Sequence, residues 1–379
     1  MRIARIETFH VPPRWLFVRV ESDEGAVGWG EASLEGWAEA VDGAFEALRD
    51  RFIDADPFRI EEAFQLGYRG GFYRGGPVLM SALAGLEQAL WDLKGRALGL
   101  PVWEMLGGRV RDRVRAYAWI GGDRPGEVAE AAAARRAQGF SAVKMNATAE
   151  LDWIGTPRLF GEVVARVEAA QGAGIDVGLD FHGRVHRPLA KQLAKLLEPL
   201  GLLFIEEPLL SENLEGLADI AALVSTPIAL GERLHSRWDF KRFLAAGAVD
   251  IIQPDLSHCG GILEARKIAA MAEAYDVAVA PHCPLGPLAL AACLQLAACT
   301  PNHAIQEMSL GIHYNVGADL FSFCTDKAVL DPAGGYIAIP EGPGLGVAID
   351  EAAVREADRD RHRWRNPIFR TADGSFAEW

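Results

Sequence analysis

Six acidic or imidazole side chains recur along the middle of this 379-residue chain, each at the end of a short apolar run. They are Asp180, Glu206, Glu232, Asp255, His282 and Glu307. Consecutive members lie about 25 residues apart, the length of one strand–helix unit in a parallel β/α barrel. Barrel enzymes carry their chemistry at the carboxyl ends of the strands, so we expect the six side chains to meet at one mouth. Helix caps and surface charges would not keep such a register.

The first three of these residues, Asp180, Glu206 and Glu232, are expected to bind a divalent cation. Three carboxylates from adjacent strands, with no cysteine near them, form a hard oxygen site. Magnesium (Mg²⁺) suits such a site because it takes few carboxylates and keeps positions for substrate and water, and manganese (Mn²⁺) is its substitute. Glu207 is adjacent to Glu206 in a strand, so it should point to the opposite side and make a salt bridge.

His182 follows Asp180 by two positions, behind the apolar run 175–179. Side chains two apart in a strand face the same side, so the carboxylate and the imidazole are expected to leave the strand end together. His182 would then be an acid or base beside the cation. The alternative is that Asp180 caps the next helix and His182 is an ordinary loop histidine.

Asp255 and His282 end neighbouring runs and predict a carboxylate–imidazole dyad. The acid would orient the ring and favour its protonated form, which prepares a base for use near neutral pH. Across the site, Lys144 and Asn146 end the second run. A second lysine at position 146 would offer a base on the opposite face, whereas Asn146 can hydrogen-bond but cannot deprotonate. Lys144 either takes part directly in catalysis or pairs with a ligand carboxylate.

Eight apolar runs, with a helix-length segment between each consecutive pair, must position these side chains. The runs are Val114–Trp119, Ala142–Met145, Asp176–Phe181, Leu202–Glu207, Ile228–Glu232, Val249–Pro254, Val277–Pro281 and His303–Met308. This alternation predicts an α/β fold with a parallel barrel that begins near residue 112. The last helix, about Leu288–Ala298, is apolar nearly all round and should be well buried.

The amino-terminal third has a different pattern. Residues 2–10, 15–22 and 26–31 alternate like the strands of an antiparallel meander, and helical patterns follow near 37–53, 58–66 and 77–97. The glycine-rich stretch 70–76 follows no strand and lacks the Gly-Lys-Ser/Thr ending of a phosphate loop, so we expect a loop that shapes a pocket. The Pro/Gly-rich stretch 340–346 should return to the meander.

Composition excludes several classes of function. The formal net charge of −14 and the absence of a basic stripe argue against nucleic acid as a partner. The five cysteines are sparse and show no CxxC spacing, which argues against a disulfide scaffold or a structural zinc site. No signal-peptide core or membrane-spanning run is present, so we expect a cytoplasmic protein without a membrane partner.

These residues, in this order on eight β/α repeats, resemble the enolase superfamily and its mandelate racemase-like branch over nearly the whole chain. The metal triad specifies only the superfamily, whereas the histidine after the first ligand strand, together with the dyad, indicates a sugar-acid dehydratase. The stretches that carry the resemblance are Pro12–Trp15, Gly71–Pro77, Leu179–Val185, Gln253–His258, Ala280–Pro287, Gly311–Asn315 and Ala377–Trp379.

The resemblance implies a fold and an assembly. An α+β capping domain (residues 1–111) should cover a (β/α)7β barrel (112–320), and a carboxyl-terminal segment (321–379) should return to the capping domain. The substrate should be a small sugar acid, an aldonate, whose carboxylate is bound by magnesium. The chain should form a homo-oligomer, and the resemblance implies an octamer.

The resemblance also assigns roles to individual residues. Asp180, Glu206 and Glu232 hold the metal, while the catalytic group comprises His182 as acid, His282 as base, Asp255 as its partner, Glu307 as stabiliser of the intermediate and Lys144 as a source of positive charge. Substrate contacts are expected from Asn146, Arg14, Trp15 and His313. Trp15 has a core position as its alternative, and His313 has packing against Tyr314.

Three other functions compete with this reading. A dehydratase of another epimer is the nearest, because the loop 147–153 after Asn146 departs from the family pattern at the barrel mouth. Racemisation of a 2-hydroxy acid shares the first step but needs proton donors on both faces of one carbon, and His182 would have to replace Asn146. A non-catalytic barrel predicts the loss of at least one site residue, and none is lost.

Overall fold

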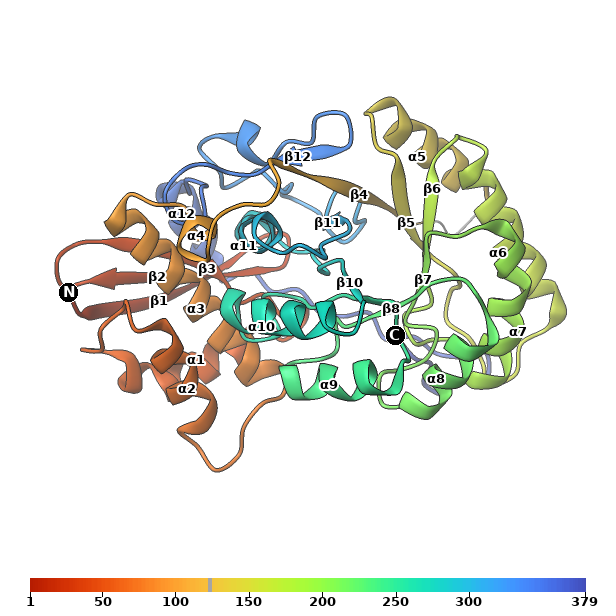
Figure 1. Cartoon of the computed structure of the whole chain (residues 1–379), viewed down its shortest axis with the longest axis horizontal. Coiled ribbons are helices and arrows are strands. Elements are labelled where there is room, and N and C mark those ends of the chain that lie inside the picture. Colours follow the sequence, from red (N-terminus) through yellow and green to blue (C-terminus); the bar gives the residue numbers. More distant parts are fainter. Residues whose placement is uncertain (122–124) are drawn as a thin grey trace.

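The computed structural model describes residues 1–121 and 125–379, and its amino-terminal part is a three-stranded antiparallel meander covered by helices (Figure 1). The strands are β1 (Ile3–Val11), β2 (Trp15–Ser22) and β3 (Val27–Glu31), in the order β1-β2-β3. The helices are α1 (Ala38–Phe52), α2 (Ile60–Arg69), α3 (Pro77–Leu98) and the short α4 (Val102–Met105). The meander and the three long helices therefore form where the sequence predicts them.

Helix α3 is the element that joins the meander to the rest of the molecule. It begins with Pro77, whose fixed φ suits a first turn, and ends at Gly99 in the left-handed conformation. Its middle lies so close to β3 that a Cβ on Gly30 would stand 2.2 Å from the carbonyl oxygen of Gly85. Glycine at position 30 is therefore a requirement of the close approach between strand and helix.

Eight parallel strands in the described residues form the barrel. They are β4 (Arg113–Gly121), β5 (Ala142–Asn146), β6 (Asp176–Asp180), β7 (Phe204–Glu206), β8 (Ile228–Leu230), β9 (Ile251–Ile252), β10 (Ala278–Val279) and β11 (Gln306–Met308). The strand order is β10-β9-β8-β7-β6-β5-β4-β11. A parallel bridge between Val279 and His303 joins β10 to the segment before β11, so the sheet curls until its two ends meet. The predicted α/β barrel is confirmed.

Seven helices connect these strands and cover the outside of the barrel (Figure 1). They are α5 (Pro125–Ala137), α6 (Pro157–Gln171), α7 (Arg187–Leu197), α8 (Leu214–Leu223), α9 (Arg237–Ala246), α10 (Ile262–Glu273) and α11 (Pro287–Ala298). Every residue of α11 is buried, as its apolar sequence predicts. The alternation of eight strands with seven helices is the predicted (β/α)7β arrangement.

The lower interior of the barrel is filled by side chains and is not a channel. A separate apolar cluster combines the rings of Tyr117 and Phe204, 6.0 Å apart, with small residues from other strands. Gly178 faces these rings, and a Cβ there would stand 2.5 Å from Phe204. This plug leaves only the carboxyl ends of the strands open for a ligand.

Two buried carboxylates fix the capping domain to the barrel helices. Glu31, at the end of β3, accepts hydrogen bonds from the backbone N–H groups of Gly286 and Ala289 at the start of α11. Glu87 of α3 accepts from Ile262 and Leu263 at the start of α10 in the same way. Burial raises the pKa of both carboxyl groups to about 7, although the N-terminal N–H groups favour the charged form.

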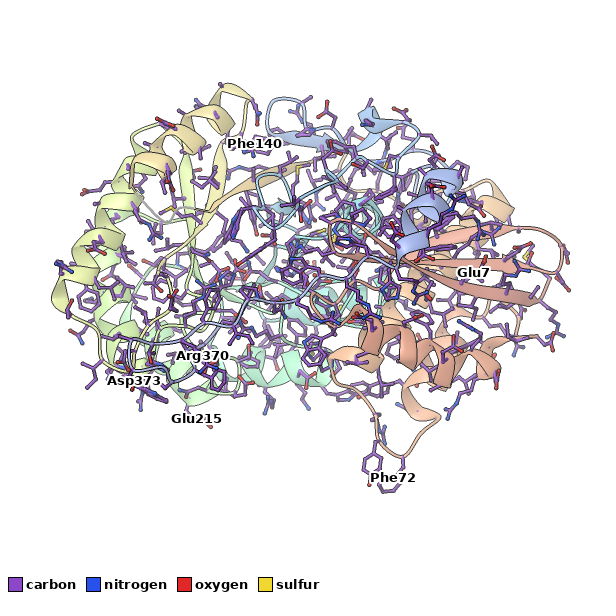
Figure 2. All side chains as sticks on the ribbon, turned by 180° about the vertical axis from the view of Figure 1, so that it is seen from behind. Glu7, Phe72, Phe140, Glu215, Arg370 and Asp373 are labelled. Carbon is purple, nitrogen blue, oxygen red and sulfur yellow. The ribbon has the colours of Figure 1, made fainter. Side chains whose placement is uncertain are left out.

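The carboxyl-terminal segment contacts first the barrel and then the capping domain. Strand β12 (Tyr336–Ala338) pairs antiparallel with β4, and helix α12 (Glu351–Ala357) packs on β1, where Arg355 forms an ion pair with Glu7. The last residues then leave the capping domain. Figure 2 shows Arg370 and Asp373 at the barrel end of the molecule, far from Glu7. The return to the capping domain therefore covers only part of this segment, and the boundaries at 111/112 and 320/321 remain predictions.

The glycine-rich loop before α3 differs from its expected role. It projects from the body of the molecule, and Phe72 and Tyr73 are 90% and 86% exposed (Figure 2). None of residues 70–76 lines the cavity at the barrel mouth, whereas Pro77, the residue that follows them, does. Among the helices of the described residues, none is both long enough and apolar enough to cross a bilayer.

A buried histidine before β11 makes the stability of the fold depend on pH. Burial, with a smaller contribution from the charge of Arg111, lowers the pKa of His303 from 6.5 to about 3. The unfolded chain therefore binds a proton that the folded chain excludes, and stability falls as pH drops from 6.5 towards 3. Between pH 7.5 and pH 4.5 we expect His303→Gln to reduce the loss of unfolding free energy by about 2 to 3 kcal/mol. Urea unfolding at these two pH values measures the difference, and an equal loss in both proteins would contradict it.

Candidate active site

A cavity of about 490 Å³ opens at the carboxyl ends of the barrel strands. Its floor includes Lys144, Glu232, His282 and Glu307 from the barrel. The loops after β1 and after β3 of the capping domain and the last residues of the chain complete its walls. The volume suits a ligand of a few hundred daltons or less. We call this space the central cavity.

The three predicted metal ligands converge at the base of the central cavity. Oxygen atoms of Asp180, Glu206 and Glu232 all lie within 4.8 Å of one another. Asp180 and Glu206 are the last residues of β6 and β7 and are partners in the strand register. Glu232 follows Gly231, at which a Cβ would stand 2.7 Å from the backbone of Gln253.

The charge balance of this triad fits a bound cation. Burial, followed by the negative charge of Asp180, raises the pKa of Glu206 well above its usual range. A divalent cation would relieve this repulsion, and a donor set made only of oxygen atoms favours magnesium, calcium or manganese. The residues present therefore fit the predicted metal centre, without deciding between these ions.

Lys144 lies among carboxylates beneath the cavity. Its Nζ is 2.8 Å from Glu206 Oε1 and 2.9 Å from Glu307 Oε1, and it also lies 3.7 Å from Asp180 Oδ2. Burial alone would lower the pKa of Lys144, but the charges of Glu206 and Glu307 raise it well above the ordinary value. Lys144 is therefore a fixed positive charge that pairs with a ligand carboxylate, one of the two roles left open by the sequence.

The predicted dyad forms on the next two strands. Nδ1 of His282 donates a hydrogen bond to Asp255 Oδ2 at 2.8 Å, and the other oxygen of Asp255 accepts from the N–H of Ser257. Nε2 of His282 lies 3.2 Å from Glu232 Oε2, at the metal triad. Burial lowers the pKa of His282, but the charges of Glu232 and Glu307 and the bond to Asp255 raise it well above 6.5 overall.

His182 stands beside Asp180, although strand alternation is not the reason. Strand β6 ends at Asp180, and His182 adopts a left-handed conformation with φ of 50°. In this turn its N–H donates to Asp180 Oδ1 at 2.7 Å, while Nε2 lies 2.8 Å from Asp180 Oδ2. The ring centroid is 5.9 Å from that of Trp119 and 6.1 Å from that of Trp379. The predicted proximity is therefore present through a turn and not through a strand.

The remaining predicted residues divide between the cavity and the core. Glu307 reaches the cavity, and its Oε2 accepts from the N–H of Cys283 at 2.9 Å. Asn146 also lines the cavity, and its Oδ1 is buried without a hydrogen-bond partner among the described residues. His313 lines the cavity and packs on Tyr314 with ring centroids 3.9 Å apart.

The two residues predicted from the capping domain have different positions. Arg14 lines the cavity, but its guanidinium donates to Asn315, Glu35 and the carbonyl oxygen of Pro284. It thus braces the capping domain against the barrel. Trp15 does not line the cavity; it is 1% exposed and packs against Phe17 and Phe323, so the structure places it in the core. Arg14 lies in the turn before β2, whereas Trp15 is the first residue of that strand and faces the core.

Several residues in and beneath the cavity escaped the sequence analysis. Gln253 donates to Glu206 Oε2 at 2.7 Å, and its position two residues before Asp255 was an available signal for an inward-facing side chain. His258 lies behind the dyad, with Nε2 3.6 Å from Asp255 and 3.7 Å from Glu35. Arg233 makes the predicted salt bridge of Glu207, at 3.2 Å. No local pattern marks Glu35, because it reaches the site from the capping domain.

Removal of one triad carboxylate should weaken cation binding strongly. Glu206→Gln removes one negative charge from the triad, while the positive charge of Lys144 remains. The remaining carboxylates then offset less of the repulsion between Lys144 and the cation. Mutation of a residue that hydrogen-bonds to a metal ligand typically lowers metal affinity by about 10 to 100-fold. Because Glu206 is itself a ligand, we expect its substitution to lower affinity by at least about 100-fold and to reduce activity in parallel. Calorimetric titration with magnesium measures this. Glu215→Gln, an exposed position on α8, makes the same charge change and should bind as the unmodified chain does. Unaltered affinity in Glu206→Gln would exclude it as a ligand.

Comparisons with known proteins agree with this geometry. Residues 127–353 match the family described as enolase C-terminal domain-like, and residues 6–107 match the mandelate racemase/muconate lactonizing enzyme N-terminal domain. The chain is 56% identical to a D-galactonate dehydratase of Ralstonia pickettii (strain 12J) over 382 residues, with 100% of both chains covered. It is 55% identical to a D-galactonate dehydratase of Ralstonia nicotianae, again over the full length of both.

Solved structures show the same fold. The crystal structure of an enolase from Agrobacterium radiobacter, bound to Na and L-malate, superposes with a TM-score of 0.91 at 30% identity over 100% of both chains. A member of the enolase superfamily from Salmonella Typhimurium gives a TM-score of 0.86 at 28% identity, over 94% of this chain and 98% of the other.

Proposed function

The chain belongs to the mandelate racemase/muconate lactonizing enzyme branch of the enolase superfamily, and on that premise we propose that it is a D-galactonate dehydratase. This hydro-lyase converts D-galactonate to 2-dehydro-3-deoxy-D-galactonate and water. The observation that carries the proposal is the pair of imidazoles beside one acid triad. His282, held by Asp255, stands at Glu232, and His182 stands at Asp180. The full-length relatives at 55–56% identity point to the same substrate.

The triad of Asp180, Glu206 and Glu232 would hold the cation, for which we propose magnesium, with manganese as a substitute. A cation held there would supply positive charge close to the substrate carboxylate, where negative charge develops during the reaction.

The base of the reaction is His282. In the neutral ring, the hydrogen bond from Nδ1 to Asp255 leaves the lone pair on Nε2, and in this form His282 takes the proton from C2 of the substrate. Negative charge then moves to the carboxylate oxygens as an enediolate forms. Glu307 donates a hydrogen bond to one of these oxygens when it is protonated, and the fixed charge of Lys144, 2.9 Å from Glu307, acts in the same direction.

The acid of the reaction is His182. As an imidazolium it protonates the 3-hydroxyl as that group leaves, and the enol that results becomes a 2-keto-3-deoxy acid. Asp180 accepts a hydrogen bond from the backbone N–H of His182, and its Oδ2 lies 2.8 Å from Nε2 of the ring, so the orientation of the imidazole is fixed. The two histidines thus divide the two proton transfers of a dehydration between them.

Magnitudes show where most of the rate must come from. One positioned acid or base contributes about 10² to 10⁴-fold, whereas enzymes accelerate their reactions by about 10⁶-fold or more. The remainder depends on charges that are already in place when the enediolate forms. Lys144 meets this requirement, because its ion pairs hold it rigid and charged below the cavity.

Racemisation of a 2-hydroxy acid lacks these supports. Racemisation needs a second base across the substrate, and Asn146 cannot supply one, while Lys144 is charged and buried among carboxylates. A dehydratase of gluconate or another epimer would use the same machinery and differ only in the residues that read hydroxyl positions. As part of the proposal, the chain forms a homo-oligomer, with the octamer as the expected assembly, which light scattering would measure.

The test is a screen of the purified chain with magnesium against a library of aldonates, scored by formation of 2-keto-3-deoxy acids. We expect turnover of D-galactonate above that of its epimers. Turnover of another aldonate without turnover of D-galactonate would overturn the proposed substrate but would leave the proposed mechanism in place. Failure with every aldonate would overturn the proposed function.

A further inference from the structure

The last residues of the chain form part of the wall of the central cavity. After α12 the chain crosses from the capping domain to the barrel mouth, where Asn366 donates to the carbonyl oxygen of Glu35 at 3.1 Å. A turn over residues 370–376 is closed by a bridge between Arg370 and Phe376. The N–H of Ala377 then donates to the carbonyl oxygen of Phe369, and this return places Trp379 at the cavity.

Side chains from distant parts of the sequence hold the indole of Trp379. Its ring centroid lies 6.1 Å from that of Tyr314 and 6.0 Å from that of Phe369, and the guanidinium of Arg184 lies 5.8 Å from it. Arg233 donates to both the carbonyl oxygen of His182 and that of Trp379. The indole is thus fixed next to His182 by contacts that do not involve the barrel floor.

Several buried polar atoms of the residues that line the cavity have no hydrogen-bond partner among the described residues, and three of them are Nε1 of Trp379, Nε1 of Trp119 and Oδ1 of Asn146. Two of these three are donors and one is an acceptor. Buried polar groups are rarely left unpaired in folded proteins, because the loss of solvation is not repaid. A ligand with several hydroxyl groups, each both donor and acceptor, would satisfy all three.

We propose that Trp379 is a specificity-determining residue that recognises the hydroxyl-bearing carbons of the substrate farthest from its carboxylate. The inference rests on the proposed function, which places the carboxylate end at the triad in the floor. The rest of the sugar acid must then extend towards the mouth, where Trp379 forms the wall. The indole N–H donates to a distal hydroxyl, and the ring face packs against the C–H groups of the chain.

The experiment compares Trp379→Phe, which keeps an aromatic ring but removes the N–H, with the unmodified chain. The ligands are D-galactonate, through its kcat and KM, and a four-carbon aldonate of the same configuration at C2 and C3, through its inhibition constant against D-galactonate. We expect kcat/KM for D-galactonate to fall about tenfold, mainly through KM. The inhibition constant of the four-carbon acid, which lacks the distal hydroxyls, should change less than about twofold.

Trp379→Ala should extend the same pattern, with a larger loss for D-galactonate than for the shorter acid. Phe376→Ala is the matched control, because Phe376 belongs to the same tail but is 72% exposed and packs on Arg370 away from the cavity. Phe376→Ala should change neither kcat/KM for D-galactonate nor the inhibition constant of the four-carbon acid. Thermal unfolding of each variant shows whether the fold is intact.

The outcomes are distinct. Equal losses for both ligands, or a fall in kcat alone, would show that Trp379 only positions His182 and would overturn the inference. Unchanged constants for D-galactonate would overturn it as well. If the unmodified chain turns over a different aldonate, the proposed substrate fails, and the same comparison between that acid and its four-carbon analogue tests Trp379. If it turns over none, the proposed function fails, and the inference falls with it.

Discussion

His282→Asn is expected to lower kcat for dehydration by about 10⁴-fold and to abolish exchange of the substrate C2 proton with solvent. Asparagine has nearly the shape of the imidazole and can still donate to Asp255, so the wall of the cavity should keep its form. What it lacks is an atom with the basicity to take a proton from carbon. Both the chemical step and the exchange pass through that proton, so both should be lost together.

The control for this variant is His186→Asn. This variant carries the same histidine-to-asparagine change at a position outside the cavity. There the ring of His186 stacks on that of Trp153, with centroids 4.0 Å apart. Calorimetric binding of magnesium checks that the triad of His282→Asn is intact, since Nε2 of His282 lies 3.2 Å from Glu232. Exchange at C2 that continues in His282→Asn at the rate of the unmodified chain would show that another group is the base.

His182→Asn is expected to stop dehydration to a similar degree, by about 10³ to 10⁴-fold in kcat, for a different reason. The substitution removes the acid that protonates the leaving 3-hydroxyl, while the dyad of Asp255 and His282 is on the other side of the triad and is not touched. Formation of the 2-keto-3-deoxy acid, followed by a colorimetric assay, measures the loss. Dehydration at more than about a tenth of the normal rate would mean that water or another side chain protonates the hydroxyl.

Much of the site could be predicted because parallel β/α repeats convert spacing in sequence into proximity in space. The regular interval between Asp180, Glu206 and Glu232 was enough to place three oxygen atoms within 4.8 Å of one another. The dyad of Asp255 and His282 followed from the same register. These residues depend only on the strand that carries them and on its neighbour, and such local constraints can be read from one sequence.

Other features depend on chain segments that no local pattern relates. The position of Trp379 depends on how a tail without regular structure crosses from the capping domain to the mouth, and Glu35 reaches the site from a loop of the other domain. His182 was placed correctly, but the strand ends before it and a left-handed turn directs the ring. Trp15 and Arg14 are adjacent in sequence, and only the packed sheet decides which of them is core.

The central claim is that two histidines divide the reaction, with His282 taking the C2 proton and His182 expelling the hydroxyl. The most direct test is the proton NMR signal of C2 during incubation of D-galactonate with the His182→Asn variant and magnesium in D₂O. The account predicts that this signal fades as deuterium enters C2, while little 2-keto-3-deoxy acid forms, and that His282→Asn leaves the signal unchanged. A C2 signal that persists in His182→Asn while it fades in His282→Asn would reverse the two assignments and contradict the account.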